Sequence, residues 1–363
     1  MNFSRLTCLI SLLFLYALTA FSQTQKLQSH DKTSFLIEGS AFPDSVKESS
    51  YDRVPAAYKP LLRPYMWDLS KSSAGLSVRF VTNSTRIGVK WTLISDARMD
   101  HMADTGIKGL DLYCKVGKSW EFVNTARLSG INNEFLLVDN MSKVSREYRM
   151  FLPLYDGVTN LEVLTDSLSS FEKPAPLTSK PIVFYGTSIT QGGCASRPGM
   201  AYTNIISRKL DVNCVNLGFN GNGKMEKPIA ELMSGIEASF YVVDCVPNMS
   251  VADILTNTKP LIDVLRAKQP RTPIVLVEGL MYEKSFLDDS TKALINNKNT
   301  ALKSEYTKLI KAKYSNIYYI DNVNALGSDH EGTVDGVHLT DLGFLRFSDF
   351  LIAKFRSLRL KIK

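Results

Sequence analysis

The stretch that decides the fold reads Pro181-Ile182-Val183-Phe184-Tyr185-Gly186-Thr187-Ser188-Ile189-Thr190-Gln191-Gly192-Gly193. Its apolar run is typical of a buried strand, and it stops at Gly-Thr-Ser before a glycine-rich turn. Open α/β folds place their ligands at the carboxyl ends of parallel strands, and this turn presents a serine hydroxyl there. Ser188 is therefore a candidate nucleophile, provided that another side chain can take its proton.

Apolar strands alternate with amphipathic helical stretches from Pro181 onward. Strands that are apolar throughout are buried on both faces, as in a parallel sheet. The pattern predicts a three-layer α/β domain over residues 180–363 with right-handed crossovers. We predict strands over 182–185, 212–217, 240–243, 274–277 and 317–320, and helices near 202–210, 261–265, 291–313 and 342–358.

Residues 34–165 follow a different pattern. Leu76, Val78 and Phe80 alternate with polar residues, and several later segments repeat this period of two between turn signals. Such alternation is typical of half-buried antiparallel strands. It predicts a β-sandwich, of jelly-roll type, over residues 30–168, with no helix of any length. The stretch 23–32 is polar and is expected to be loose, and 166–180 is expected to be a linker.

The N-terminus is typical of an export signal. Arg5 supplies a positive start, and Leu6 to Ala20 is almost wholly apolar but short for a membrane span. Small residues at Ala20 and Ser22 predict cleavage before Gln23, so residues 1–22 are expected to be a signal peptide. The mature protein is then secreted or periplasmic, without stable membrane insertion. The alternative is an uncleaved membrane anchor.

The composition argues against a nucleic-acid-binding protein, a disulfide-rich scaffold and a cysteine-based zinc site. The chain has 363 residues, which favours two domains, and its net charge of +7 is spread along the sequence without a Lys/Arg block. We therefore expect no nucleic-acid partner. The mature chain keeps four cysteines, too few for a disulfide framework and without zinc-site spacing: Cys114, Cys194, Cys214 and Cys245. We place Cys214 and Cys245 in the core and Cys194 at the rim of the pocket, and a single disulfide is left open.

A base for Ser188 is available near the C-terminus. The mature chain has few histidines, and His338 lies in Asp335-Gly336-Val337-His338. The spacing of three residues lets Asp335 hold the ring nitrogen that faces away from the serine, which fixes the tautomer and stabilises the imidazolium. Ser188, His338 and Asp335 are thus the candidate catalytic residues.

An oxyanion needs fixed hydrogen-bond donors. Gly221 follows the second predicted strand of the α/β domain, and Asn248 follows the third. The backbone N–H groups of Ser188 and Gly221 and the side chain of Asn248 form the candidate oxyanion hole. A loop glycine and a helix-capping asparagine are the alternative interpretations of Gly221 and Asn248.

Other residues are candidate contacts for substrate. His101 lies in a long loop of the first domain that can lean over the pocket, although a surface loop is the alternative. Gly193 is expected to leave room for substrate beside Ser188. Glu278 ends a strand on the pocket side and can line the site, with a structural role as the alternative.

These blocks resemble the SGNH, or GDSL-type, hydrolase superfamily, whose four blocks contribute serine, glycine, asparagine and histidine in that order. They match Ser188 in Gly-Thr-Ser, Gly221 in Asn-Gly-Asn, Asn248 in Pro-Asn-Met and His338 in Asp-Gly-Val-His-Leu. The resemblance implies a flavodoxin-like sheet and ester or acyl-transfer chemistry without a metal or other cofactor. Two blocks depart from the usual pattern: Gly-Asp-Ser is replaced by Gly-Thr-Ser, and Gly-x-Asn-Asp by Pro-Asn-Met.

The first domain resembles the β-sandwich that precedes the hydrolase domain in one branch of this superfamily. That branch has a Gly-x-Asp-Leu-Tyr signature, which appears here as Gly109-Leu110-Asp111-Leu112-Tyr113. Asp111 and Tyr113 lie in a strand pattern, so we expect them to be structural.

We expect an exported serine esterase that hydrolyses short acyl esters, above all O-acetyl groups on carbohydrate. The substrate follows from context: export, the partner sandwich and a small open pocket. Two alternatives remain: an acyltransferase that uses the same residues, and a carbohydrate-binding protein with an inactive hydrolase domain. None of these features predicts an oligomeric state.

Overall fold

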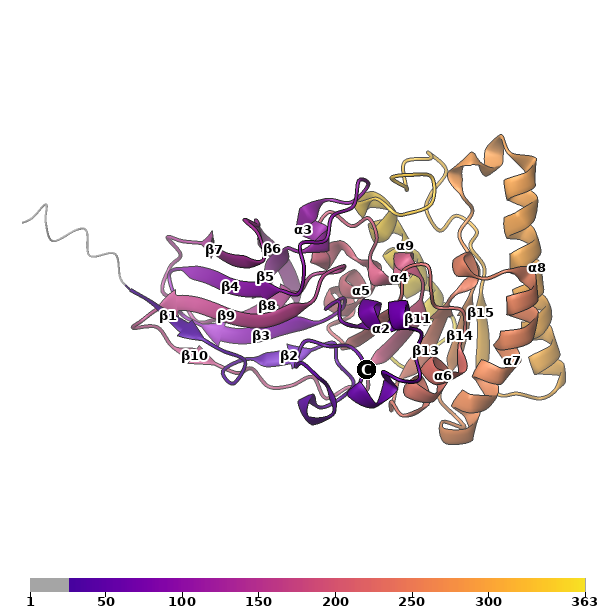
Figure 1. Cartoon of the computed structure of the whole chain (residues 1–363), viewed down its shortest axis with the longest axis horizontal. Helices are drawn as coiled ribbons and strands as arrows, with labels where there is room; N and C mark the ends of the chain where they lie inside the picture. The colour runs from indigo at the N-terminus through magenta and orange to yellow at the C-terminus, as the bar shows by residue number, and fades with distance from the viewer. Residues whose placement is uncertain (1–25, 363) are drawn as a thin grey trace, which may run out of the picture.

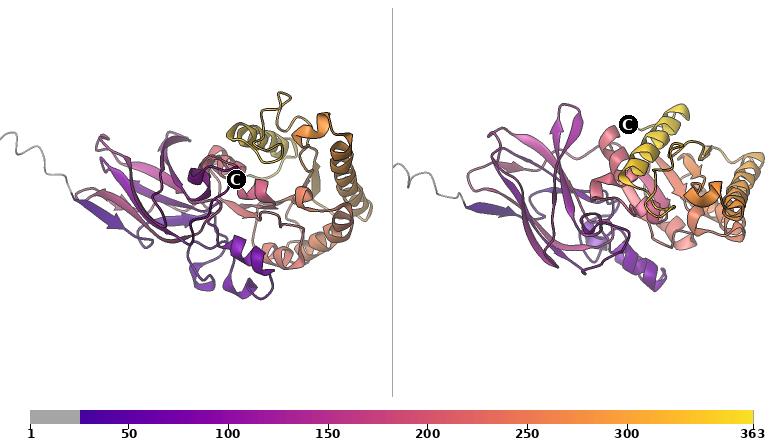
Figure 2. Two further views of the ribbon diagram at one scale, coloured as in Figure 1. Left: turned by 45° about the horizontal axis from the view of Figure 1, so that its top comes forward. Right: turned by 90° about the horizontal axis from the view of Figure 1, so that it is seen from above.

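The computed structural model describes residues 26–362 and places an all-β sandwich beside a helix-covered parallel sheet (Figure 1). The two halves differ in architecture in every view (Figure 2). The expected signal peptide over residues 1–22 lies outside the described residues. None of the helices within 26–362 combines the length and apolarity that a membrane span needs.

The sandwich consists of two antiparallel sheets. One has the order β1-β9-β4-β7, and the other has the order β10-β3-β8-β5-β6 with β2 paired to β3. The strands are β1 (Leu27–His30), β2 (Leu36–Glu38), β3 (Ser77–Thr82), β4 (Ile87–Leu93), β5 (Leu110–Val116), β6 (Ser119–Ala126), β7 (Asn132–Val138), β8 (Arg146–Phe151), β9 (Val158–Asp166) and β10 (Phe171–Glu172). The alternating residues Val78, Phe80, Val89 and Trp91 meet in the core between the sheets, as the period of two predicts.

Several local expectations for the first half are wrong. The segment expected to be loose contains β1, which pairs with β9 from Leu27 to His30. The expected linker contains β10, which pairs with the end of β3. Helices also interrupt the strands: α2 (Pro64–Ser70) and α3 (Asp104–Ile107). β1 and β10 are too short to show a clear alternation of polar and apolar residues. Each pairs with a strand that is distant in sequence, so no local pattern predicts it.

The second half contains a parallel sheet with the order β12-β11-β13-β14-β15, which is the flavodoxin-like order. Its strands are β11 (Ile182–Gly186), β12 (Cys214–Gly218), β13 (Phe240–Asp244), β14 (Ile274–Val277) and β15 (Ile317–Ile320). All pairs are parallel and in continuous register. Because β11 lies between β12 and β13, the loops after these strands meet at one edge of the sheet.

Helices cover both faces of this sheet, so the domain has three layers. Val183 and Tyr185 of β11 point into one core with α6 and α7, whereas Ile182 and Phe184 point into the other with α5 and α9. The sequence did not predict α6. The helices are α4 (Ser188–Gln191), α5 (Tyr202–Leu210), α6 (Lys227–Ser234), α7 (Val251–Lys268), α8 (Asp289–Lys311) and α9 (Asp341–Ser357).

The Gly-x-Asp-Leu-Tyr motif joins the two domains. Asp111 of β5 is fully buried, and its carboxylate accepts hydrogen bonds from the Gly199 N–H (2.9 and 3.0 Å) and from Arg197 Nη1 (2.7 Å). The Tyr113 hydroxyl accepts a further hydrogen bond from Arg197. Asp111 and Tyr113 therefore hold the loop before α5 in place, which is a structural role, as expected from their positions in a strand.

Candidate active site

Ser188 lies where β11 gives way to α4, at the carboxyl edge of the sheet. Thr187 caps this short helix: its Oγ1 accepts from the Ile189 N–H (3.3 Å). The departure from Gly-Asp-Ser is therefore accommodated, because threonine supplies the oxygen that an N-cap needs. The Ser188 N–H is one of the first donors of the helix, which have no intrahelical acceptor. Ser188 itself is 7% exposed.

The three candidate catalytic side chains form one chain of hydrogen bonds. Ser188 Oγ lies 2.9 Å from His338 Nε2, and His338 Nδ1 lies 2.7 Å from Asp335 Oδ2. Since the Asp335 carboxylate accepts the Nδ1 proton, Nε2 is left to accept the proton of the serine. This order of donors and acceptors is what a serine nucleophile and its base require.

A tight turn fixes Asp335 against His338. Asp335 Oδ1 accepts from the backbone N–H groups of His338 (2.7 Å) and Val337 (3.0 Å), and Gly336 has a φ of 87°, which favours glycine. Burial works against ionisation of Asp335, but the hydrogen bonds from the His338 ring and these N–H groups outweigh it and lower its pKa to about 2. Asp335 is therefore a carboxylate at neutral pH.

The candidate oxyanion loop follows β12. Gly221 is exposed, has a φ of 64°, and its backbone N–H makes no hydrogen bond to any residue in 26–362. A Cβ at this position would meet nothing within 4 Å, so the backbone borders open space. The conformation favours glycine, and the free N–H can reach an incoming oxygen.

Asn248 reaches the same loop from the other side of Ser188. It ends the short 3-10 helix η4 (Val246–Asn248), which follows β13. Its Nδ2 donates to the carbonyls of Asn222 and Phe219, the latter at 3.5 Å. The amide is thus anchored beside Gly221, and its N–H groups are engaged with these two carbonyls.

His101 extends from the sandwich to the candidate active site. Its ring centroid lies 5.5 Å from that of His338, and its Nδ1 lies 3.0 Å from Asp100 Oδ1. Cys194 lies close to both histidines and is buried rather than at the rim. All four cysteines in residues 26–362 are free thiols, so the disulfide that the sequence left open does not form among them.

Two expected substrate contacts do not lie as expected. The space beside Gly193 is filled, because a Cβ there would lie 2.5 Å from the Tyr155 hydroxyl. Glu278 accepts hydrogen bonds from the Tyr319 hydroxyl and from the Asn322 N–H (3.2 Å), next to β15 at the far side of the sheet from β12. Protein neighbours therefore account for Gly193 and Glu278, which argues against a role in binding substrate.

Asp244 is a buried carboxylate that the sequence did not single out. It ends β13 and accepts hydrogen bonds from the Tyr202 hydroxyl (3.1 Å) and from Thr190 Oγ1 (3.3 Å). Burial raises its pKa to about 7, although both hydrogen bonds favour the carboxylate. No described cation forms an ion pair with it within the structure, so its charge is costly when the group ionises.

This pKa predicts a pH dependence of stability. The folded protein holds the Asp244 proton more tightly than the unfolded chain does, so the stabilisation is present at low pH and is lost as the pH rises through about 7. Between about pH 5 and pH 8, the free energy of unfolding of the wild type should fall by about 2–3 kcal/mol relative to Asp244→Asn. Urea unfolding of both proteins across this range measures the difference, and parallel curves would contradict the assignment.

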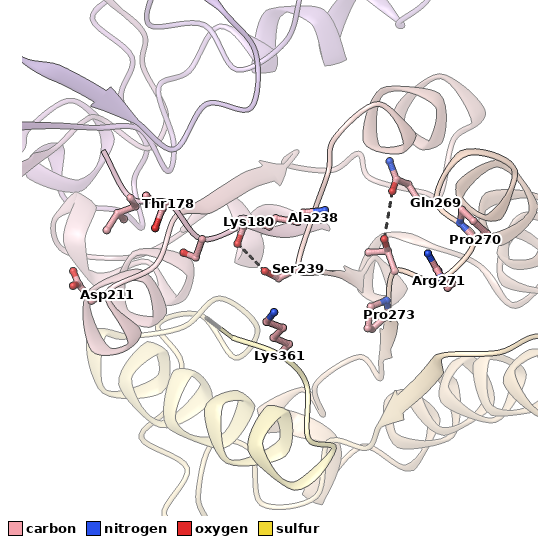
Figure 3. A pocket seen from close by; sticks show the side chains of 13 residues that line it. Thr178, Lys180, Asp211, Ala238, Ser239, Gln269, Pro270, Arg271, Pro273 and Lys361 are labelled. Atoms are coloured by element: carbon pink, nitrogen blue, oxygen red, sulfur yellow. Dashed lines mark hydrogen bonds between the residues drawn. The ribbon is translucent and has the colours of Figure 1, made fainter. Parts of the chain in front are cut away.

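A hollow of about 880 Å³ opens at the opposite end of the sheet (Figure 3). Lys180 precedes β11, Ala238 precedes β13 and Thr272 precedes β14, so the hollow borders the amino ends of the strands. Lys361 faces the same space. Ser188 follows the carboxyl end of β11, and this hollow is therefore separate from the candidate active site.

Models of two known families match the two halves of the chain. The profile of the GDSL-like lipase/acylhydrolase family matches residues 179–356, and the profile of the GxDLY domain, the N-terminus of SGNH-hydrolase-type esterases, matches residues 27–171. No curated protein matches the chain.

Solved structures are similar over most of the chain. A GDSL-like lipase from Bacteroides ovatus is 36% identical, with 93% of this chain and 100% of that chain covered and a TM-score of 0.88. A salicylyl-acyltransferase from a tetracycline biosynthetic pathway is 17% identical, with 92% and 99% covered and a TM-score of 0.76. A family two carbohydrate esterase from Clostridium thermocellum, in complex with cellohexaose, is 13% identical, with 78% and 93% covered and a TM-score of 0.59. The last two show the shared fold. The chain belongs to the GDSL-like lipase/acylhydrolase family, with a GxDLY domain before its hydrolase domain.

Proposed function

We propose that the protein is an exported serine esterase that hydrolyses short acyl esters, with O-acetyl groups on carbohydrate as the substrate class. The observation that supports this proposal most strongly is the chain from Ser188 through His338 to Asp335, with distances of 2.9 and 2.7 Å. The apolar N-terminal stretch supports export to the periplasm or the medium.

The first half-reaction forms an acyl-enzyme. Ser188 Oγ attacks the ester carbonyl while His338 Nε2 takes the serine proton, and Asp335 stabilises the resulting imidazolium. The tetrahedral oxyanion lies against the N–H groups of Ser188 and Gly221 and the Asn248 amide. As the intermediate collapses, His338 returns the proton to the leaving alcohol.

The second half-reaction releases the acid. Water attacks the acyl-enzyme carbonyl, His338 takes a proton from the water, and Ser188 recovers its proton when the second tetrahedral intermediate collapses. Another alcohol in place of water would make the protein an acyltransferase.

A panel of esters tests the proposal. p-Nitrophenyl acetate, butyrate and octanoate and acetylated xylo-oligosaccharide would be assayed with wild type and Ser188→Ala. We expect acetate release from the oligosaccharide, and kcat/KM that falls with acyl length. Equal activity on the octanoate would contradict the short-acyl assignment, and product esters formed with added alcohol would favour acyl transfer. If the protein binds sugar but releases no acid, and if a fluorophosphonate does not label Ser188, the carbohydrate-binding alternative would be favoured.

Removal of one oxyanion donor should lower turnover. We expect Asn248→Ala to reduce kcat on an acetyl ester by about 10²-fold, with a much smaller effect on KM, because this donor is needed chiefly as the oxyanion forms. Asn257→Ala is the matched control: its Nδ2 donates to the Lys224 carbonyl (3.0 Å), outside the proposed hole. If both variants lose kcat equally, the assigned role of Asn248 is wrong.

A further inference from the structure

We propose that the mouth of the active site binds a zinc-type divalent cation through His101, Cys194 and His338, and that this cation reversibly blocks the enzyme. One ligand atom of each of these residues lies within 4.8 Å of the other two. Around tetrahedral zinc, nitrogen and sulfur donors lie roughly 3.3–3.8 Å apart, so small side-chain rotations close the site. The His101 side chain is 36% exposed and is free to make such a rotation.

The surroundings of both histidines suit a metal. Asp100 and Asp335 each engage the Nδ1 atom of the neighbouring histidine, at 3.0 and 2.7 Å. A carboxylate on one ring nitrogen is the usual partner of a histidine that binds metal through the other. Burial, and after it the charges of Asp335 and Asp100, raise the pKa of the Cys194 thiol to about 12, so a metal must displace the thiol proton. The negative charge of the same two carboxylates attracts a cation. Two imidazoles and a thiol select a zinc-like ion over magnesium or calcium.

Metal binding would deprive Ser188 of its base. The cation takes the Nε2 lone pair of His338, so the hydrogen bond from Ser188 Oγ–H is broken and the serine loses its base. The Cys194 thiol releases its proton to solvent as the sulfur–metal bond forms, and no redox step is involved. The inhibition rests on the proposed function, whereas the binding does not.

Cobalt binding is the test, because it needs no substrate. Co²⁺ added to the full chain should give a thiolate-to-metal charge-transfer band and the d–d bands of tetrahedral cobalt, and Zn²⁺ should displace them. We expect Cys194→Ser to abolish the charge-transfer band, and we expect it and His101→Gln each to weaken Zn²⁺ binding at least about tenfold. Cys114→Ser and His330→Gln are the matched controls.

The outcomes test two claims separately: that the metal binds at this site, and that the bound metal inhibits the enzyme. Absence of a thiolate band in the wild type, or equal weakening by Cys114→Ser, would overturn the site. If Zn²⁺ binds but does not inhibit hydrolysis of the ester panel, the site stands and the blockage is wrong. A wild type without esterase activity that still binds cobalt would count against the proposed function alone.

We also infer that Arg53 and Gln191 are positioning residues for the oxyanion loop. Arg53 comes from the N-terminal half but its guanidinium is fully buried against the end of β12. Nη1 donates to the carbonyls of Gly218 (2.8 Å) and Asn216 (3.2 Å), just before the loop that holds Gly221. Nε and Nη2 donate to Ser72 and to the Leu69 carbonyl.

Among residues 26–362 the hydrogen-bond acceptors of Arg53 are all neutral, its guanidinium also lies 4.8 Å from the centroid of the Phe219 ring, and burial lowers its pKa to about 9. A buried cation held by carbonyls, hydroxyls and one aromatic ring is costly, so its presence here needs a reason beyond filling space. Each carbonyl that it holds is fixed in direction, and the backbone of Gly218 directs the loop that follows.

Gln191 of α4 connects the sandwich domain to the loop that holds Gly221. It is fully buried in α4, its Oε1 accepts from the Asn220 N–H (2.9 Å), and its Nε2 donates to the Leu154 carbonyl (3.0 Å) of the sandwich domain. Because Asn220 precedes Gly221 directly, this bond sets the peptide plane next to the proposed oxyanion donor. The sandwich thereby holds the loop in its working shape.

Substitution of Gln191 tests this role, which rests on the proposed function. Gln191→Met removes the acceptor for Asn220, whereas Gln191→Glu keeps it. We expect Gln191→Met to lose at least about tenfold in kcat with little change in KM and to speed hydrogen exchange at the Asn220 amide. Gln191→Glu should retain more kcat than Gln191→Met, although a buried charge makes it the less stable variant.

The matched control is Asn204→Leu, which removes a buried amide that donates to the Pro198 carbonyl (2.8 Å) away from the loop. It should lower stability and leave kcat unchanged. The positioning role would be wrong if Gln191→Met showed faster exchange at Asn220 but no loss of kcat. It would also be wrong if kcat simply followed stability across Gln191→Met, Gln191→Glu and Asn204→Leu. A wild type inactive on every ester would instead count against the proposed function.

Discussion

Ser188→Ala should lower kcat on a short acyl ester by about 10⁴-fold or more while the fold is retained. The hydroxyl is the only group lost, and the backbone around it is held independently: the Ser188 carbonyl accepts from the N–H groups of Gly192 and Gly193, both at 2.9 Å. Steady-state kinetics on p-nitrophenyl acetate and thermal unfolding of the same preparation measure the two effects.

The matched control for this variant is Ser207→Ala. Ser207 is also buried, and its hydroxyl donates to the Val212 carbonyl (2.5 Å) at the far end of α5. It should lose about 1 kcal/mol of stability and no activity. Substantial activity in Ser188→Ala, beyond trace contamination by wild type, would show that another group attacks the ester.

Asp335→Asn should have the second largest effect, also about 10⁴-fold in kcat at neutral pH. An amide placed beside Nδ1 can donate to that nitrogen, which moves the ring proton to Nε2. His338 then cannot accept the proton of Ser188 Oγ, although the geometry is kept. Kinetics near neutral pH and at higher pH measure the loss.

Asp329→Asn is the control for the loss of one carboxylate from the same region. Asp329 is paired with Arg346 at 2.6 and 2.7 Å, away from the histidine. Its loss should leave kcat within about twofold, because an exposed ion pair contributes at most ~1 kcal/mol. Asp335→Asn with wild-type kcat would mean that another group orients His338.

The parallel sheet could be predicted in detail because its signal is local. Each strand is a short apolar run bounded by turns, and its helices bring amphipathic patterns. The motif blocks were also local, so the meeting of Ser188, His338 and Asp335 could be anticipated from chain order. β1 and β10 were missed because a polar four-residue strand and a two-residue strand carry no periodicity of their own.

The parts of the site that were missed depend on contacts between distant residues. Arg53 lies far in sequence from the β12 carbonyls that it holds, and no spacing rule links them. Gln191 follows Ser188 by three residues in what the sequence presents as a glycine-rich turn, yet its side chain joins the sandwich to the candidate oxyanion loop. Gly193 was expected to make space, but Tyr155 of the sandwich fills it.

The central claim is that Ser188 is activated by His338, and covalent labelling tests it most directly. The full chain would be treated with a fluorophosphonate, and the modified residue would be mapped by tandem mass spectrometry in wild type and in His338→Ala. We predict one adduct, on Ser188, and its near-complete loss without His338. An adduct on a different residue, or equal labelling of Ser188 in both proteins, would contradict the account.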